Sequence, residues 1–189
     1  PAGPATSTRR GRTPWLLAAG ALAVVAALTV VLLTRPDGSG EPQRISEYHY
    51  SFTVPDEWER SGGSQSARQV DLGPVDPAVV PDQIFVKEYE LSYDADADRA
   101  RAVEELRAAY EARRAEADPP TVDGFDEAAT FAGRDVLYYS EVVRTGTVDW
   151  YVVFGGRYQV SIGCQHDGAG AERVRSACDH VVRTLTVRP

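Results

Sequence analysis

The longest uninterrupted apolar stretch of the chain lies near its beginning. Residues 15–33 carry no charged side chain and would reach roughly 28 Å as a helix at about 1.5 Å per residue, which is enough to cross a bilayer. The alternatives are a buried core helix and a cleaved signal peptide. A signal peptide has a shorter apolar region followed by a small-residue cleavage site, whereas this stretch continues into LLTRPDG. We therefore predict a retained transmembrane helix over residues 15–34.

The charges that flank this helix predict its orientation. Arg9, Arg10 and Arg12 precede it. No acidic side chain occurs in residues 1–35, so the positive-inside bias places the N-terminal side in the cytoplasm and the rest of the chain outside. We expect a single-pass protein of the cell membrane. Its four parts are a cytoplasmic juxtamembrane linker, the transmembrane helix, a tether and an extracytoplasmic domain, at residues 1–14, 15–34, 35–46 and 47–189.

Alternating apolar and polar positions predict several β-strands after the tether. In EYHYSFTV, residues 47–54, every second side chain is aromatic or apolar, and Pro55 ends the strand. Gly62 and Gly63 are predicted to turn the chain between two short strands. The strands predicted in this part of the chain are residues 47–54, 57–60, 67–72 and 83–91.

The last third of the chain has the clearest strand pattern. Three apolar segments are separated by glycine-bearing connections of the hairpin type at 145–146 and 155–156, which predicts a meander. The strands predicted in this part are residues 127–132, 135–145, 148–154 and 158–164. We predict the core side of the sheet from the apolar row on one face of the middle segment, Val148, Trp150, Val152 and Phe154.

Two segments have the period of an amphipathic helix. In residues 94–117, larger side chains recur at steps of three and four, and Pro119 and Pro120 stop the helix. An apolar stripe in residues 170–185 predicts a second helix that packs on the sheet. The predicted fold is α+β, a mainly antiparallel sheet of about five to seven strands covered by two principal helices and preceded by one transmembrane helix. The alternative is a sheet split into two packed layers, with the first helix at an edge.

The charge of the domain argues against some classes of partner. From Pro36 onward the chain has 16 basic and 28 acidic side chains, a formal charge of −12, and Lys87 is its single lysine. A nucleic-acid-binding face must be basic, so we expect no nucleic-acid partner. Electrostatic binding to anionic lipid is disfavoured for the same reason, and membrane attachment rests on the predicted transmembrane helix.

The two cysteines are predicted to form a disulfide. Cys164 closes the last predicted strand and Cys178 lies on the apolar stripe of the second helix, in a compartment that we expect to be oxidising. The alternative is two buried free thiols. Zinc binding together with His166 and His180 is disfavoured. Residues two apart on a helix diverge by about 200°, so Cys178 and His180 point away from each other.

We expect no catalytic residue and no cofactor. The three histidines lie outside any recognisable catalytic motif, and His49 is predicted to face solvent from the polar side of a strand. Glu104 and Glu105 are adjacent on a predicted helix and point apart, unlike the paired carboxylates of a glycosidase.

Three acidic residues at the start of the first helix have the spacing of a calcium loop. They are Asp94, Asp96 and Asp98. The sixth loop position, which requires glycine, is Arg99, whose charge would repel the ion. We therefore predict a helix N-cap and favourable dipole charges instead of a metal site.

Two interpretations stay open for three aromatic residues, Tyr110, Trp150 and Tyr151. They either line an apolar pocket between helix and sheet, as a ligand-binding domain requires, or they pack in the core. Three classes of function are therefore considered: an accessory or scaffold protein without enzymatic activity, a ligand-binding domain and a hydrolase.

Two parts of the chain are similar to known families. SFTVPDEWER, residues 51–60, is similar to the opening of actinobacterial cell-envelope domains of the LpqN and PsbP-like kind, in which helices cover one antiparallel sheet. A second set of residues extends through the last third, in this order: AGRDV at 132–136, Tyr139, Glu141, VDWYV at 148–152, QVSIGCQ at 159–165, Ala177, Cys178 and VVR at 181–183. In that order it resembles the C-terminal domain of the type VII secretion-associated protein family of actinobacteria.

The second resemblance implies a membrane-anchored accessory of type VII secretion, with protein partners in the secretion machinery and no assigned catalytic residues. Family members place a cytoplasmic domain before a single transmembrane helix. This agrees with a chain that starts at Pro1 and contains no methionine, from which we expect the native protein to continue on the cytoplasmic side. The expected function is a non-enzymatic accessory of type VII secretion. The alternative is an envelope domain that binds lipid or a secreted substrate.

Overall fold

The three strands predicted in the last third of the chain form an antiparallel meander. The computed structural model describes residues 42–76, 78, 81–116 and 121–189. Within them the meander consists of β7 (Arg134–Val143), β8 (Gly146–Gly155) and β9 (Tyr158–His166). Each strand begins and ends within two residues of its predicted bounds, and successive strands pair as hairpins. The predicted meander is therefore confirmed.

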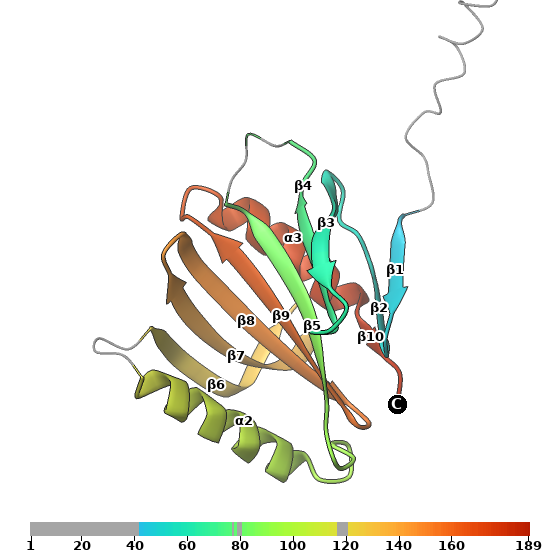
Figure 1. Cartoon of the computed structure of the whole chain (residues 1–189), viewed down its shortest axis with the longest axis vertical. Coiled ribbons are helices and arrows are strands. Elements are labelled where there is room, and N and C mark those ends of the chain that lie inside the picture. The colour runs from blue at the N-terminus through green and yellow to red at the C-terminus, as the bar shows by residue number, and fades with distance from the viewer. Residues whose placement is uncertain (1–41, 77, 79–80, 117–120) are drawn as a thin grey trace, which may run out of the picture. The chain divides into compact units, whose positions relative to one another are not determined.

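This meander is part of a seven-stranded, fully antiparallel sheet in the order β3-β4-β5-β9-β8-β7-β6 (Figure 1). The remaining strands are β3 (Trp58–Ser64), β4 (Gln69–Pro74), β5 (Gln83–Glu90) and β6 (Val122–Phe131). Spatial order departs from chain order in one place, where the whole of β5 pairs with β9. The N-terminal hairpin and the C-terminal meander therefore meet in the middle of the sheet.

A second, three-stranded sheet has the order β1-β2-β10. Its strands are β1 (Arg44–Glu47), β2 (Tyr50–Thr53) and β10 (Thr186–Val187). The single strand predicted over residues 47–54 is wrong at its start, because the chain turns at Tyr48 and His49, with Tyr48 at φ 51°. The fold begins earlier than the predicted boundary at residue 47, since β1 occupies the last residues assigned to the tether.

The hairpin of β3 and β4 turns at a different place from the one predicted. Gly62 and Gly63 lie inside β3, and the turn falls at residues 65–68. A β-bulge between Arg60 and Gly62 shifts the register. A Cβ on Gly63 would lie 2.4 Å from the carbonyl oxygen of Gln69. The two glycines therefore allow close strand approach around a bulge, which a turn prediction from composition does not distinguish.

Both predicted helices are present, as α2 (Arg99–Arg114) and α3 (Ala171–Thr184), although α2 begins five residues later and ends three residues earlier than predicted. The acidic segment before α2 caps it, as predicted, because the Asp98 side chain accepts a hydrogen bond from the Arg101 backbone N–H. The Asp96 carboxylate accepts another from the Gly156 N–H at 2.8 Å. This second bond fixes the loop before α2 to the β8–β9 turn.

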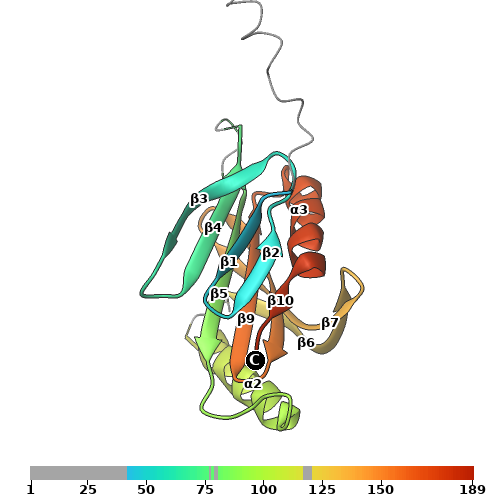
Figure 2. The same ribbon diagram turned by 90° about the vertical axis from the view of Figure 1, so that its right-hand side faces the viewer.

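The two helices lie on opposite faces of the large sheet. We call the side covered by α3 and the small sheet the closed face, and the side toward α2 the open face. α3 contacts β9, β5 and β2, whereas α2 contacts β6 near the sheet edge. Figure 2 shows α3 beside β1, β2 and β10, with α2 at the far end of the molecule. The predicted α+β fold, with two helices on a mainly antiparallel sheet, is confirmed in this part of the chain.

The side of β8 predicted to face the core is the open face. Val152 and Phe154 pack there in a small cluster with residues of α2. The larger core lies on the closed face and includes Tyr151 and Val153 of the same strand. The prediction chose the heavier apolar row, but apolar side chains pack against a helix on each face of this sheet, so alternation along one strand does not identify the main core.

The predicted linker and transmembrane helix, at residues 1–14 and 15–34, lie outside the described residues, as does most of the tether. Neither α2 nor α3 is long and apolar enough to cross a membrane, and the described part of the chain has no other candidate span.

Candidate ligand-binding groove

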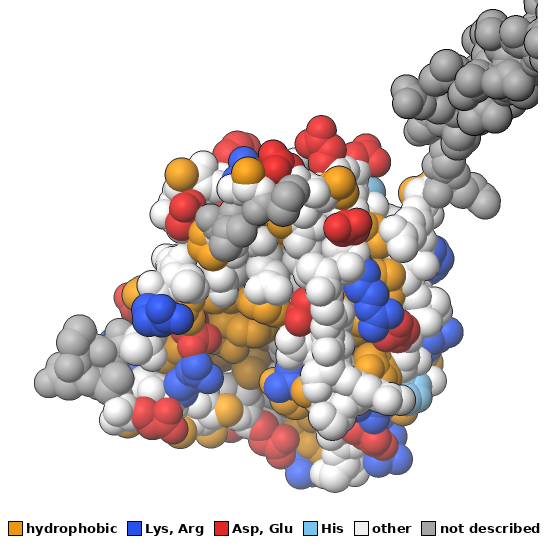
Figure 3. Space-filling view, turned by 45° about the horizontal axis from the view of Figure 1, so that its top comes forward, with side chains coloured by type: hydrophobic (Ala, Val, Ile, Leu, Met, Phe, Trp, Pro, Cys, Tyr) orange, Lys and Arg blue, Asp and Glu red, His pale blue; other side chains and the backbone are white. Residues whose placement is uncertain are grey.

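A groove of about 950 Å³ lies between α2 and the open face of the large sheet. Its floor is formed by β5, β9, β8 and β7, and its wall by α2. Figure 3 shows apolar side chains at the bottom of a hollow, with acidic and basic side chains around it. The volume falls within the range of roughly 300–1,000 Å³ that is usual for small-molecule sites.

Four residues that face one another across neighbouring strands form the aromatic part of the floor. Phe85, Gly163, Trp150 and Tyr139 are successive cross-strand partners on β5, β9, β8 and β7. The Trp150 ring centroid lies 6.5 Å from that of Phe85 and 6.2 Å from that of Tyr139. A Cβ at position 163 would lie 2.7 Å from Trp150 Cζ3. Glycine at this position therefore lets the indole lie across β9.

A polar row lies next to the aromatic one. Gln69, Lys87 and Ser161 are cross-strand partners on β4, β5 and β9. The Gln159 side-chain N–H donates to Ser161 Oγ at 3.2 Å. The floor is therefore amphipathic, with hydrogen-bonding and charged groups beside a strip of aromatic rings.

The wall of the groove is the inner side of α2. The α2 residues that line it are Ala102, Glu105, Leu106, Ala109, Tyr110, Ala112 and Arg113. The alanines leave space that larger side chains would fill. Tyr110 closes the base of the wall, with its ring centroid 5.0 Å from Phe125 and 5.8 Å from Tyr139.

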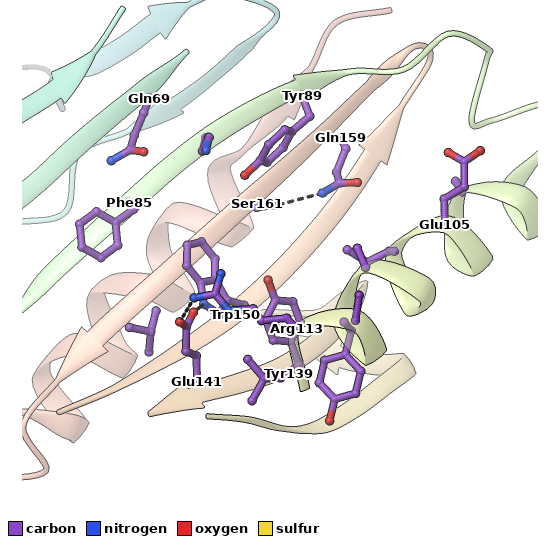
Figure 4. Close-up of a pocket in the computed structure, with 18 of the residues that line it drawn as sticks. Gln69, Phe85, Tyr89, Glu105, Arg113, Tyr139, Glu141, Trp150, Gln159 and Ser161 are labelled. Atoms are coloured by element: carbon purple, nitrogen blue, oxygen red, sulfur yellow. Dashed lines mark hydrogen bonds and ion pairs between the residues drawn. The ribbon is translucent and has the colours of Figure 1, made fainter. Parts of the chain in front are cut away.

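An ion pair joins the wall to the floor. The Arg113 guanidinium pairs with the Glu141 carboxylate, which also accepts a hydrogen bond from Trp150 Nε1–H at 3.0 Å. Figure 4 shows the Glu141 carboxylate pointing toward Arg113 and Trp150. Glu141 is 7% exposed, so its charge is compensated by Arg113 and its second oxygen by the indole. Burial, and then the charge of Glu141, raises the pKa of Tyr139 to about 12.

A cluster of three hydrogen-bonded side chains lies at the mouth of the groove. The Tyr93 hydroxyl donates to Glu105 at 2.9 Å, and Arg101 Nε donates to the same carboxylate at 2.9 Å. These bonds, from Arg101 first and Tyr93 second, lower the pKa of Glu105. The carboxylate is therefore ionised and held by two partners, which makes it a poor general base.

The sequence left open whether three aromatic residues line a pocket or pack in the core, and the structure places two of them in the groove and one in the core. Tyr110 and Trp150 line the groove. Tyr151 lies on the closed face, where its ring stacks on Phe131 at 4.0 Å. Because neighbours on a strand point to opposite faces, Trp150 and Tyr151 cannot share one pocket.

Several groove residues were not predicted from the sequence. These are chiefly Phe85, Lys87, Arg113, Tyr139 and Glu141. Alternation along β5 contains the signal that puts Phe85 and Lys87 on one face. That Phe85 meets Trp150 and Lys87 meets Ser161 depends on the pairing of β5 with β9, which no local pattern indicates.

The predicted disulfide between Cys164 and Cys178 is confirmed. It joins β9 to α3 on the closed face, with 6.2 Å between the two Cα atoms. His166 Nε2 lies 3.4 Å from Asp149, and His180 Nε2 lies 2.7 Å from Thr53 Oγ1. Among the described residues, no three His, Cys, Asp or Glu side chains gather as metal ligands. The structure therefore places the two cysteines in a crosslink and the two histidines in separate hydrogen bonds.

The His49 side chain is 38% exposed, in line with the prediction that it faces solvent, and it also joins an ionic cluster around the buried Glu88. Its ring stacks on Tyr158 at 3.8 Å, and its Nδ1 lies 3.1 Å from Glu88 Oε1. Glu88 is 2% exposed and pairs with Arg68 at 2.5 Å. It also accepts a hydrogen bond from the His49 backbone N–H at 2.7 Å. The turn after β1 places His49 here, so the cluster ties the small sheet to the large one.

Comparisons with known proteins give low similarity only. No family model matches the chain, and no curated protein matches it in sequence. A protein from Bacteroides thetaiotaomicron is similar in structure, with a TM-score of 0.46 and 13% identity over 78% of this chain. This chain spans only 49% of that protein's length.

Two further solved structures have similar scores. The cyanobacterial PsbP (CyanoP) of Synechocystis has a TM-score of 0.44 and 15% identity, covering 82% of this chain and 99% of its own. LpqN of Mycobacterium tuberculosis, which is involved in cell envelope biogenesis, has a TM-score of 0.45 and 16% identity, covering 80% and 88%. No match supports the type VII secretion-associated family. Scores this low do not bear on function.

Proposed function

We propose that this domain binds an apolar or amphipathic ligand outside the cytoplasm, in the groove between α2 and the large sheet. The observation that carries the proposal is the groove itself, which has an aromatic floor and a wall of small residues. The disulfide supports an oxidising compartment, which agrees with an extracytoplasmic domain.

The proposal is of binding without chemical conversion. Two of the three acidic residues that line the groove, Glu141 and Glu105, are each held by an arginine. The hydrogen bond to Glu141 holds the Trp150 indole in position, so this part of the floor is ordered in the absence of a ligand. Such preorganisation lowers the entropy lost on binding.

Two matched variants of α2 test the groove. Ala109 lines it, whereas its neighbour Ala108 does not, and both are exposed helical positions at which tryptophan can be accommodated. We expect Ala109→Trp to reduce binding of the neutral dye Nile red to the full chain by more than tenfold, and Ala108→Trp to leave it unchanged. Equal binding by both variants, or no binding by the native chain, contradicts the proposal.

The second candidate function is a membrane-anchored accessory of type VII secretion, held by the transmembrane helix predicted at residues 15–34. One observation favours it. Residues that carry the resemblance to that family also line the groove, namely Tyr139, Glu141, Val148, Trp150, Gln159, Ser161 and Gln165. The groove would then be the binding site of the accessory.

Crosslinking in native membranes, with mass spectrometry of the captured proteins, tests this candidate. Recovery of type VII membrane components supports it. Unchanged export of type VII substrates after deletion of the domain argues against it. Protease added to intact protoplasts should remove the domain and spare a tag placed before Pro1, and protection of the domain would reverse the proposed topology.

A further inference from the structure

The only lysine of the chain lies in the groove. Of the 20 basic residues, 19 are arginine and one is Lys87. It is half-buried on β5 and lines the groove floor, between Gln69 of β4 and Ser161 of β9. A single flexible ammonium in the lining of a candidate binding site is a specific feature, because its compact charge can pair with one ligand group.

Lys87 differs from Arg113 and Arg101 in having no carboxylate partner within the part of the chain that the structure describes. Arg113 pairs with Glu141, and Arg101 pairs with Glu105. No ion pair among the described residues includes Lys87, whose Nζ lies 4.7 Å from the Tyr89 ring centroid. A cation that is partly removed from water and lacks a counterion is stabilised when an anion binds beside it. Glu116, which also lines the groove, is exposed just beyond the end of α2.

A neutral donor lies next to this cation. Ser161 is 4% exposed, and its hydroxyl oxygen accepts a hydrogen bond from Gln159. The hydroxyl proton is donated to no other described residue, so it is free to bind a ligand oxygen. Lys87 and Ser161 are directly opposite each other on β5 and β9. Together they form a small site for an anionic head group.

The aromatic strip beside this site suits the apolar part of the same ligand. Along β5, Phe85 is two residues from Lys87 on the same face, and along β9, Gly163 is two residues from Ser161. Two residues of a strand correspond to about 7 Å, so an oxygen bound at Lys87 lies within a few carbon atoms of the aromatic rings. A chain that starts at the head-group site can then lie across Trp150.

We propose that the ligand is a fatty acid, whose carboxylate pairs with Lys87 and accepts a hydrogen bond from Ser161 while its alkyl chain covers the aromatic strip. One unpaired cation matches a head group with a single negative charge better than a phosphate monoester, which carries up to two. This inference rests on the proposed binding function of the groove. It adds the charge and chemical class of the ligand.

Competition experiments with the full chain in nanodiscs test this inference. The assay measures how strongly dodecanoate, dodecanol and dodecyl phosphate each displace bound Nile red. The Ala109→Trp variant gives the background signal from dye bound to the nanodisc. We expect the native chain to bind dodecanoate at least tenfold more tightly than dodecanol. Lys87→Gln should abolish this preference and Lys87→Arg should retain most of it, when the affinity for each ligand is compared with the Nile red affinity of the same variant.

The outcomes separate this inference from the proposed function. Dodecanol binding equal to dodecanoate binding, or a preference that survives in Lys87→Gln, overturns the fatty-acid assignment while the groove remains a binding site. Tighter binding of dodecyl phosphate overturns the choice of a carboxylate. Failure of all ligands and of Nile red refutes the proposed function itself.

A spectroscopic test uses the single lysine directly. Reductive methylation with ¹³C-formaldehyde labels only Lys87 and the α-amino group, so the second signal is an internal control. We expect dodecanoate to shift the methyl signal of Lys87 and dodecanol to leave it in place. No shift by dodecanoate under conditions in which it displaces Nile red contradicts the pairing with Lys87.

Discussion

The closed and open faces of the large sheet are made by the same strands, but one is a core and the other contains a groove. On β8, Tyr151 and Val153 pack under α3, whereas Trp150 and Val152 face the groove side. All four side chains are apolar or aromatic. Apolar side chains on one face of a strand therefore indicate that another element packs on that face. The placement of that element decides how much of the face it buries.

The difference lies in the two helices. α3 buries five residues against the sheet: Val174, Ala177, Cys178, Val181 and Val182. α2 is two residues longer and buries only Ala102 and Tyr110. Arginine and glutamate occupy much of its surface, and it contacts the sheet mainly at the edge strand β6. A helix anchored at an edge leaves the middle of the sheet uncovered, and this is where the groove lies.

The largest expected contrast is in the loss of stability when a side chain is shortened. Phe52 is fully buried on the closed face, so Phe52→Ala should lower the free energy of unfolding by about 3–5 kcal/mol. Leu106 lines the groove and is half-buried, so Leu106→Ala should lower it by about 1 kcal/mol. Urea unfolding monitored by circular dichroism measures both. Similar losses would mean that the open face is packed as tightly as the closed one.

Removal of the disulfide should affect the closed face alone. Cys164 and Cys178 close a loop with a sequence separation of 14 residues, and the double alanine variant should lose roughly 3 kcal/mol of stability. Reduction of the native chain should produce a similar loss, which controls for the substitutions themselves. Binding of Nile red in the groove should not change. Loss of binding in a variant that remains folded would show that the faces are coupled.

Alkaline pH should weaken both faces. Burial raises the pKa of Tyr139 on the open face to about 12, and it raises that of Tyr151 on the closed face even further. Tyrosine in the unfolded chain titrates near 10. The stability that each buried, neutral tyrosine contributes is therefore fully present below pH 10 and is lost as pH rises toward and through the folded-state pKa.

We expect each tyrosine to account for about 1 kcal/mol of the loss between pH 8 and pH 11. Urea midpoints of Tyr139→Phe and Tyr151→Phe at these two pH values measure the contributions. Each substitution should make stability less dependent on pH than in the native chain. Equal pH dependence in the native chain and both variants would contradict the assignment.

The smallest expected effect is that of the ion pair across the groove. Arg113 is 54% exposed on its side chain and is screened by solvent, so Arg113→Gln should lower the free energy of unfolding by less than about 1 kcal/mol. Trp150 keeps its bond to Glu141, and its fluorescence should change little. A loss above about 3 kcal/mol would indicate that Glu141 is desolvated as in a closed core.

Much of the local structure could be predicted from the sequence. The hairpins of β7, β8 and β9 follow from alternation interrupted by glycine, and α2 and α3 follow from apolar spacing between capping and stop signals. The disulfide followed from two cysteines in a compartment expected to be oxidising. These features depend on short windows of sequence, in which the period of the side chains determines which of them share a face.

Other features were decided only by the tertiary structure. His49 was assigned to a strand position, but the turn at Tyr48 carries it to Glu88, 39 residues away along the chain. Lys87 meets Ser161 because β5 pairs with β9 across an intervening helix and three strands. The sequence determined which residues alternate on each strand. Strand order, and with it the groove, was decided by contacts between distant segments, because those pairings are selected by the packing of the whole domain and leave no periodic signal in either strand.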